Sequence, residues 1–301
     1  MTVPHFHDKL VVVGSANIDL VTRVPRCPKA GESLIGSAFT IVPGGKGANQ
    51  AVAAARLGAE TAFVGCVGLA GVAVDYLIRH DSDPTGTAVI FVADDGSNAI
   101  AVTPGANLAI TPADVERARP LLQQADAMLV QLEIALEATE AALRIARECN
   151  VLSVLDAGPA QSLPPEIARL ADIVSPNETE AEAITDIAVD SIERAEQAAH
   201  AIRGMGAANV VMKLGELRAL CVGEGGSEHA HACKVNAIDT VAAGDAFTAA
   251  LAYAWDPQHI RQSLQFANAA GALATTRRGA QDAMPTRSEV DNLLKEHPSH
   301  A

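Results

Sequence analysis

The sequence predicts an α/β fold, in which a doubly wound, mostly parallel sheet is flanked by helices and carries a small β-lid. Short apolar runs alternate with helical patterns along most of the 301 residues, and only two segments break this order. Hydrophobic residues make up 49% of the chain and aromatic residues only 3%, so aliphatic side chains must fill the core. Such a composition is typical of helices packed on a parallel sheet.

The expected strands and helices follow one another in regular order. The first strand is the apolar run 10–14, and similar runs occupy residues 62–65, 127–130, 151–155 and 210–213. Small or apolar residues recur at helical spacing between them, in residues 47–57, 137–148 and 192–205. This alternation predicts parallel strands joined by right-handed helical connections.

Two segments, residues 16–42 and 85–103, instead resemble short strands broken by Gly and Pro, most clearly at 33–42 and 87–92. We expect them to pair as a lid inserted in one α/β domain that spans the chain. A lid of this kind excludes water from a reacting group.

Charge and cysteine usage exclude several functional classes. The net charge is −14 without a long basic run, which disfavours nucleic acid and anionic membranes as partners. The five cysteines are scattered and form no CxxC pair, which argues against a zinc site or a disulfide framework. No signal-peptide pattern and no apolar run of about 20 residues occur, so we expect a cytoplasmic protein.

The strongest motif is DTVAAGDAF, residues 239–247, where small residues turn into an Ala-rich helix. The amides of Ala242, Ala243 and Gly244 can converge on an anion there, supported by the helix dipole. Asp245 in the first helical turn would face the same point and accept a proton from an attacking hydroxyl. The alternative is an acidic residue that only favours the helix N-terminus.

Residues 43–49, PGGKGAN, place three glycines around Lys46, with Asn49 in the next helix. The spacing is not that of a Walker A loop. The motif indicates close approach of the backbone to a ligand, or merely a Gly-rich turn between a strand and a helix.

Two further pairs of polar residues share a face of their element. Asn17 and Asp19 are two apart, so on a strand both can grip sugar hydroxyls, unless they simply face solvent. Asn177 and Glu180 are three apart at a helix start, where Glu180 could hold Mg²⁺ through water. The alternative for this second pair is a capping box.

In this order, these motifs resemble the ribokinase family, the phosphofructokinase-B type of sugar kinases. The resemblance runs nearly end to end and is carried by GSANID (14–19), PGGKGANQAVAAARLGA (43–59), PNETEAE (176–182), DTVAAGDAF (239–247) and TRRGAQDAMP (276–285). It implies a ribokinase-like fold, often dimeric through the lid, that transfers the ATP γ-phosphoryl group to the primary hydroxyl of D-ribose, giving ribose 5-phosphate. Asp245 would be the general base and the amides of 242–244 the anion hole.

The same resemblance implies binding residues for each ligand. The sugar would contact Asn17, Asp19, Gly44, Gly45, Lys46, Asn49, Glu133 and Asp245. ATP would contact Asn177, Lys213, Gly215, Arg218, Gly244 and Asn268, and Glu180 would help to place Mg²⁺. A monovalent cation, usually K⁺, would lie at Asp239, Val241, Ala274, Arg277, Gly279 and Ala283, mostly on backbone carbonyls.

Three departures from the family pattern leave alternatives open. About one helix is missing after Gly68, Arg218 replaces a glycine of the nucleotide loop, and Ala283 replaces a frequent serine. The chain could therefore be a binding protein that has lost catalysis. Another sugar or a nucleoside could also be the acceptor, although the lid offers only Phe39 and Phe91 for stacking a base.

Overall fold

The predicted parallel sheet is present in the computed structural model, which describes residues 6–68, 77–79, 83–95, 97–215 and 218–296. Within these residues the sheet has nine strands. Seven of them run parallel (β11, β10, β9, β8, β1, β4 and β5), while β12 and β13 are antiparallel at one edge. Their spatial order is β13 (Gly226–His231), β12 (Arg218–Gly223), β11 (Asn209–Leu214), β10 (Ile173–Ser175), β9 (Leu152–Asp156), β8 (Ala127–Gln131), β1 (Lys9–Val13), β4 (Glu60–Val67) and β5 (Leu77–Arg79). All five predicted strands belong to this sheet.

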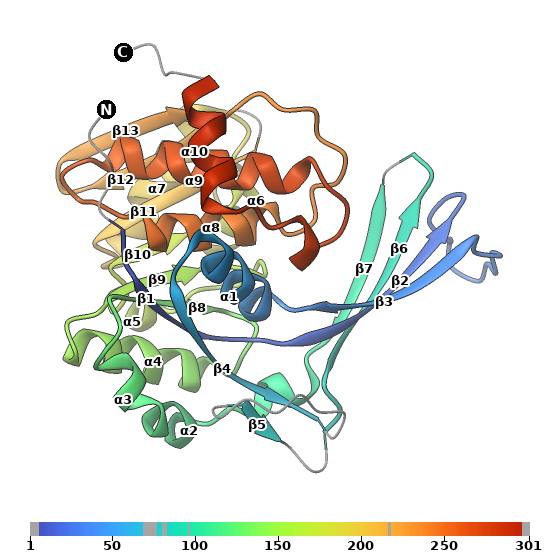
Figure 1. The fold of residues 1–301 in the computed structure, drawn as a ribbon, viewed down its shortest axis with the longest axis horizontal. Helices are drawn as coiled ribbons and strands as arrows, with labels where there is room; N and C mark the ends of the chain where they lie inside the picture. Colours follow the sequence, from blue (N-terminus) through green and yellow to red (C-terminus); the bar gives the residue numbers. More distant parts are fainter. Residues whose placement is uncertain (1–5, 69–76, 80–82, 96, 216–217, 297–301) are drawn as a thin grey trace.

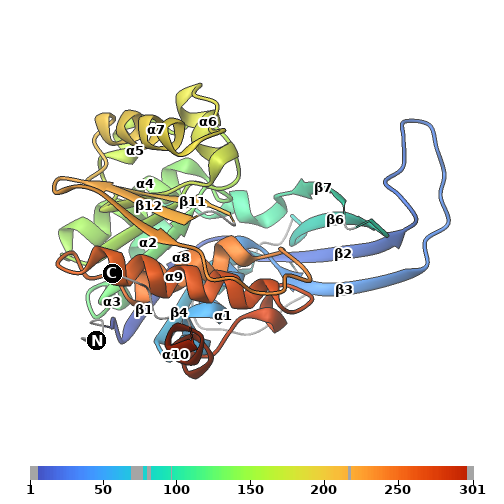
Figure 2. The ribbon, with the colours of Figure 1, turned by 90° about the horizontal axis from the view of Figure 1, so that it is seen from above.

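Helices cover both faces of the sheet (Figures 1 and 2). One face carries α1 (Lys46–Leu57), α8 (Ala243–Tyr253), α9 (Ile260–Thr275) and α10 (Arg287–Glu296). The other carries α2 (Pro112–Arg117), α3 (Arg119–Leu122), α4 (Leu136–Glu148), α5 (Pro165–Ala168), α6 (Glu178–Thr185) and α7 (Ile192–Gly204). The three predicted helices are α1, α4 and α7. Two short 3-10 helices, η1 (Gly105–Ala109) and η2 (Gln281–Ala283), lie in connections.

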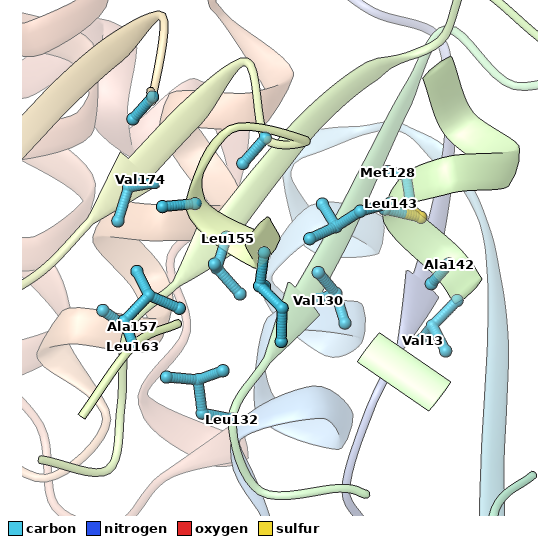
Figure 3. Packing of buried hydrophobic residues seen from close by; sticks show 14 of the residues in the cluster. Val13, Met128, Val130, Leu132, Ala142, Leu143, Leu155, Ala157, Leu163 and Val174 are labelled. Atoms are coloured by element: carbon cyan, nitrogen blue, oxygen red, sulfur yellow. The ribbon is translucent and has the colours of Figure 1, made fainter. Parts of the chain in front are cut away.

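The core is aliphatic and divided by the sheet into two layers. Successive residues of β1 alternate between them, since Val11 and Val13 pack under one helical layer and Leu10 and Val12 under the other. Figure 3 shows the first layer, where Leu143 of α4 packs beside Met128 of β8. This packing fixes the carboxyl ends of the parallel strands, from which the candidate site is built.

The lid is a separate sheet of four strands in the described part of the chain, in the order β3 (Ala38–Gly44), β2 (Asn17–Val24), β6 (Gly86–Ala93) and β7 (Asn98–Thr103). It extends away from the body of the molecule (Figures 1 and 2). One boundary differs from the prediction, because residues 33–37 form no strand and β3 begins at Ala38. Ile35 is 92% exposed, and the Ser37 amide, which donates to the Arg23 carbonyl at 2.9 Å, makes the first hydrogen bond to β2.

The helix expected to be missing after Gly68 concerns residues 69–76, which lie outside the described residues. Beside this gap, β5 is a three-residue edge strand with half-buried Leu77 and Ile78. Among the helices that the structure describes, none is both long and apolar enough to cross a membrane.

Candidate active site

The turn before α8 has the form that the DTVAAGDAF motif predicts. α8 begins at Ala243, and Ala242 caps it in the left-handed conformation, with φ of 60°. The amide of Ala243 donates to the carbonyl of Thr240 at 3.3 Å. No partner is found among the described residues for the amides of Ala242 and Gly244, which are half-buried. Two amides at a helix N-terminus are therefore open to an anion.

Asp245 lies in the first turn of α8 and is almost completely buried. Its Oδ2 accepts a hydrogen bond from Asn49 Nδ2 at 2.9 Å, and its Oδ1 accepts one from Gln50 Nε2 at 3.2 Å. Lys46 Nζ lies 3.8 Å from Oδ1. Burial raises the pKa of Asp245 to about 6, and the nearby Asp156 carboxylate adds to the rise while Lys46 opposes it. Asp245 therefore ionises close to neutral pH, as a general base should.

Lys46 stands at the centre of the carboxylates. Its ammonium group lies 3.7 Å from Asp156 Oδ1 and 4.0 Å from Glu180 Oε1, in addition to Asp245. Burial alone would lower the pKa of Lys46, but these carboxylates outweigh it and hold the pKa above the usual range. Its backbone amide also donates to Glu133 Oε2 at 3.1 Å. Lys46 thus stays charged and links Glu133 to the carboxylates of Asp156, Glu180 and Asp245.

The start of α1 depends on Gly44 and Gly45. Gly45 caps α1 with φ of 90°, a conformation that favours glycine. Gly44 pairs with Asn17 of the lid, and a Cβ at Gly44 would lie 2.1 Å from Asp19 Oδ2. A side chain at position 44 would therefore displace Asp19 from the site.

Asn17 and Asp19 lie at the base of lid strand β2, on the same face and both buried. Asn17 Oδ1 accepts a hydrogen bond from Asn107 Nδ2 at 2.7 Å. Asp19 Oδ1 is buried with no partner found among the described residues, and Asn49 Oδ1 is in the same state. Burial raises the pKa of Asp19 to about 6, helped by the charges of Glu133 and Asp245. Unpartnered buried acceptors indicate that donors are missing, such as ligand hydroxyls.

A cavity of about 400 Å³ opens beside these residues. Asn17, Asn107 and Glu133 supply its polar wall, and Val102 and Leu108 form part of its apolar wall. Ser15 Oγ donates to Glu133 Oε2, which holds that carboxylate in the wall of the cavity. The size and mixed lining suit a small polyol rather than a large ligand.

Two of the predicted nucleotide residues, Asn177 and Lys213, lie side by side and close to Glu180. Asn177 and Glu180 form a reciprocal capping box at the start of α6, so the structure confirms the alternative interpretation of that pair. Lys213 at the end of β11 is buried, with Nζ 3.6 Å from Glu180 Oε2, and its stem passes near Gly244. Gly215 is exposed with φ of 50°, and the side chain of Arg218 lies outside the described residues.

Some predicted residues already have structural partners. Asn268 Nδ2 donates to the carbonyls of Ala230 and His231, which ties β13 to α9. Arg277 pairs with Glu289. Ala274 and Ala283 are buried in the core, so only their carbonyls could serve a ligand.

Asp239 brings together the two loops predicted to hold K⁺. Its Oδ1 accepts from the Val241 amide at 3.0 Å and its Oδ2 from the Gly279 amide at 3.1 Å. The loops that carry these residues are therefore adjacent, and one of them leads into the turn at residues 242–244 (the anion turn). Carbonyl oxygens are ligands that K⁺ accepts, so the residues fit the ion.

The fit to Mg²⁺ is of a different kind. In the described part of the chain, no group of three or more acidic, His or Cys side chains has the arrangement of a metal site. Glu180 already accepts the Asn177 amide and faces two lysines. The residues therefore fit a hydrated ion held mainly by nucleotide phosphates and only indirectly by Glu180.

Sequence reasoning missed the buried polar residues that join these parts, namely Ser15, Gln50, Asn107, Gln131, Asp156 and Thr248. Asp156 follows directly on the predicted strand 151–155, and ligand sites gather at the carboxyl ends of parallel strands. Gln50 lies four residues after Lys46 on the same helix face. Both residues could therefore have been proposed as site residues from the sequence.

Comparison with known proteins agrees with this geometry. Residues 7–287 match the model of the pfkB family carbohydrate kinases. A ribokinase of Haemophilus influenzae is 37% identical over 95% of this chain and 98% of its own length. A deoxyribokinase of Salmonella typhi is 32% identical over 95% of this chain and 98% of its own. The structure of Arabidopsis thaliana ribokinase complexed with ribose and ATP superimposes with a TM-score of 0.86 at 32% identity, covering 98% of this chain and 99% of that one.

The Lys46→Met substitution should raise the pKa of Asp245 above about 6, because Lys46 is the positive charge that most favours the carboxylate. The measurement is a ¹³C NMR titration of the Asp245 carboxyl carbon in the folded protein. Lys29→Met, in the exposed loop between β2 and β3, is the control and should leave the titration unchanged. An unchanged or lower pKa in Lys46→Met would contradict the charge arrangement described above.

Proposed function

The chain belongs to the pfkB family of carbohydrate kinases, and we propose that it transfers the γ-phosphoryl group of ATP to the primary hydroxyl of D-ribose. One observation carries the proposal: a buried carboxylate of raised pKa, Asp245, lies next to two open amides of a helix N-terminus and is hydrogen-bonded to Asn49, whose own Oδ1 has no partner among the described residues. A catalytic base, an anion hole and an acceptor site are what phosphoryl transfer to an alcohol requires.

In the proposed reaction Asp245 accepts the proton of the attacking hydroxyl as the oxygen bonds to phosphorus and the bond to the ADP leaving oxygen breaks. The amides of Ala242 and Gly244 would stabilise negative charge on the transferred group, together with Lys46 and Lys213. Asn17, Asp19, Asn49 and Glu133 would receive and orient the sugar. Bound Mg²⁺ would neutralise the phosphate charge, and K⁺ at the Asp239 loops would reinforce the anion turn.

Two observations bear on the alternatives that the sequence leaves open, a nucleoside acceptor and a protein that has lost catalysis. Phe39 and Phe91 both pair with Thr22, five residues along β2 from Asn17 and hence about 17 Å from it at the rise of a strand. They are too distant to stack a base at the site, which disfavours a nucleoside acceptor. The hydrogen bonds from Asn49 and Gln50 to Asp245, with Lys46 beside them, favour a catalytic protein over one that only binds its ligands.

We also propose that the protein is a cytoplasmic homodimer joined through its lids. Phe39 and Ile41 of β3 are 60% and 61% exposed, and the strand register places them on the same face as exposed Val89. An apolar face on a sheet that extends from the body is a surface for another protein, and an identical lid offers a matching one.

The Asp245→Asn substitution should lower kcat by roughly 10²- to 10⁴-fold, because the base is lost while the shape of the side chain is kept. ADP release with ribose, ATP and Mg²⁺ measures kcat, and calorimetric titration with ribose should show binding within a few-fold of the unsubstituted protein. Asp291→Asn on α10, distant from the site in sequence and partnered with Arg287, is the control. Turnover near that of the control would refute the role of Asp245.

Among a panel of sugars, ribose should have a higher kcat/KM than 2-deoxyribose by about 10- to 100-fold. The reason is that the buried oxygens of Asp19 and Asn49 need donors, and an acceptor left unpaired costs about 1–3 kcal/mol. ADP release measures each sugar. Equal or higher efficiency with 2-deoxyribose would make the deoxy sugar the acceptor, and turnover of no sugar would leave a binding protein.

The Ile41→Asp substitution should convert a dimer into a monomer, because it places a charge in the exposed apolar face of the lid. Light scattering after size-exclusion chromatography measures the mass. Thr40→Asp, on the opposite face of the same strand, is the matched control and should remain dimeric. A monomeric unsubstituted protein at micromolar concentration would contradict the proposal.

A further inference from the structure

Asp156, the last residue of β9, is a fully buried charge of the site, and no step proposed above uses it. Its Oδ1 accepts hydrogen bonds from Lys213 Nζ at 3.2 Å and from the Gly158 amide at 3.1 Å. Its Oδ2 accepts from Gln50 Nε2 at 2.9 Å and from Thr248 Oγ1 at 3.0 Å. One carboxylate thus collects donors from α1, α8 and β11.

The two lysines of the site meet at the same carboxylate. Lys46 Nζ lies 3.7 Å from Asp156 Oδ1, and Lys213 Nζ lies 3.2 Å from the same oxygen. Glu180 also faces both ammonium groups, with Oε1 4.0 Å from Lys46 Nζ and Oε2 3.6 Å from Lys213 Nζ. The lysines therefore keep fixed positions between two carboxylates, although like charges repel each other. Without Asp156, Lys213 would lose the shorter of its two ion pairs and would keep only that with Glu180 in a buried place.

Asp156 is also linked directly to the base. Gln50 Nε2 donates to Asp156 at 2.9 Å and to Asp245 at 3.2 Å, so one amide spans both carboxylates. The orientation of the Gln50 amide is fixed by a further hydrogen bond, in which its Oε1 accepts from Gln131 Nε2 at 2.7 Å. Lys213 connects Asp156 to the anion turn, since a Cβ at Gly244 would lie 4.0 Å from Lys213 Cδ. Both links end at groups that would touch the transferred phosphoryl group.

We propose that Asp156 is a positioning residue for phosphoryl transfer, which holds the ammonium groups of Lys46 and Lys213 and the amide of Gln50 in the places where they act. This inference rests on the proposed kinase function. In the proposed reaction Asp156 would touch neither substrate and would act through these three side chains. A role confined to bracing α1 and α8 against the sheet predicts a different set of measurements.

The test is Asp156→Asn, which keeps the size of the side chain and removes its charge. We expect kcat to fall about 10- to 100-fold, the range for residues that orient groups of an active site. ATP should bind no more weakly, because the site loses a negative charge near the phosphates and the lysines stay cationic. The expected result is therefore a loss in kcat without a rise in the dissociation constant of ATP.

Asp172→Asn is the matched control. Asp172 accepts hydrogen bonds from the amide and hydroxyl of Ser153, at the opposite end of the same strand, β9. It should leave kcat unchanged even if its melting temperature falls. Equal losses of kcat in the two variants would overturn the proposal, because loss of a brace on β9 would then explain both.

A second readout does not depend on catalysis. Lysine acylation followed by mass spectrometry should show Lys213 at least about tenfold more reactive in Asp156→Asn than in the unsubstituted protein, because the shorter of its two ion pairs is lost. Exposed Lys29 and Lys234 serve as internal references. If no sugar is turned over, the proposed function fails and the labelling alone decides. Unchanged labelling of Lys213 overturns the positioning role in either case.

Discussion

Charge compensation between two lysines and three buried carboxylates is the interaction on which the candidate site depends. Asp156, Glu180 and Asp245 come from β9, α6 and α8, and each lies within 4.0 Å of Lys46. Such carboxylates would strongly disfavour burial without a cation among them. The cluster therefore forms only when the parallel strands end at the right heights and both helical layers are packed. The charged cluster of the site therefore depends on the packing of the aliphatic core.

The sequence was most informative where one local pattern determines the structure. Continuous apolar runs predicted the buried strands, and all five were found within one residue or two of their bounds. The small residues around Ala242 predicted a tight turn into a helix, and the structure has this turn directly before Asp245. Asn177 and Glu180 illustrate the limit, because the same spacing predicts both a cation ligand and a helix cap. The cap is present, and a hydrated ion at Glu180 is compatible with it.

What local patterns could not supply is the pairing of residues distant in the chain. Asp156 and Lys213 are 57 residues apart, and Gln50 and Asp245 are 195 apart, so no periodicity relates them. A lone Asp after an apolar strand or a lone Gln on a helix carries little information until the sheet order is known. β12 went unpredicted for a related reason, since its antiparallel pairing depends on β11 rather than on a pattern of its own. The start of β3 was misplaced because exposed Ile35 reads as a strand residue by composition alone.

The position of Asn17 and Asp19 on the lid, rather than on the core, has a kinetic consequence. The acceptor would be gripped by β2 while the base belongs to α8, so a bound sugar fastens two separate sheets together. In the proposed reaction, the time for which the sugar stays bound would therefore set the time for which the lid is held against the body.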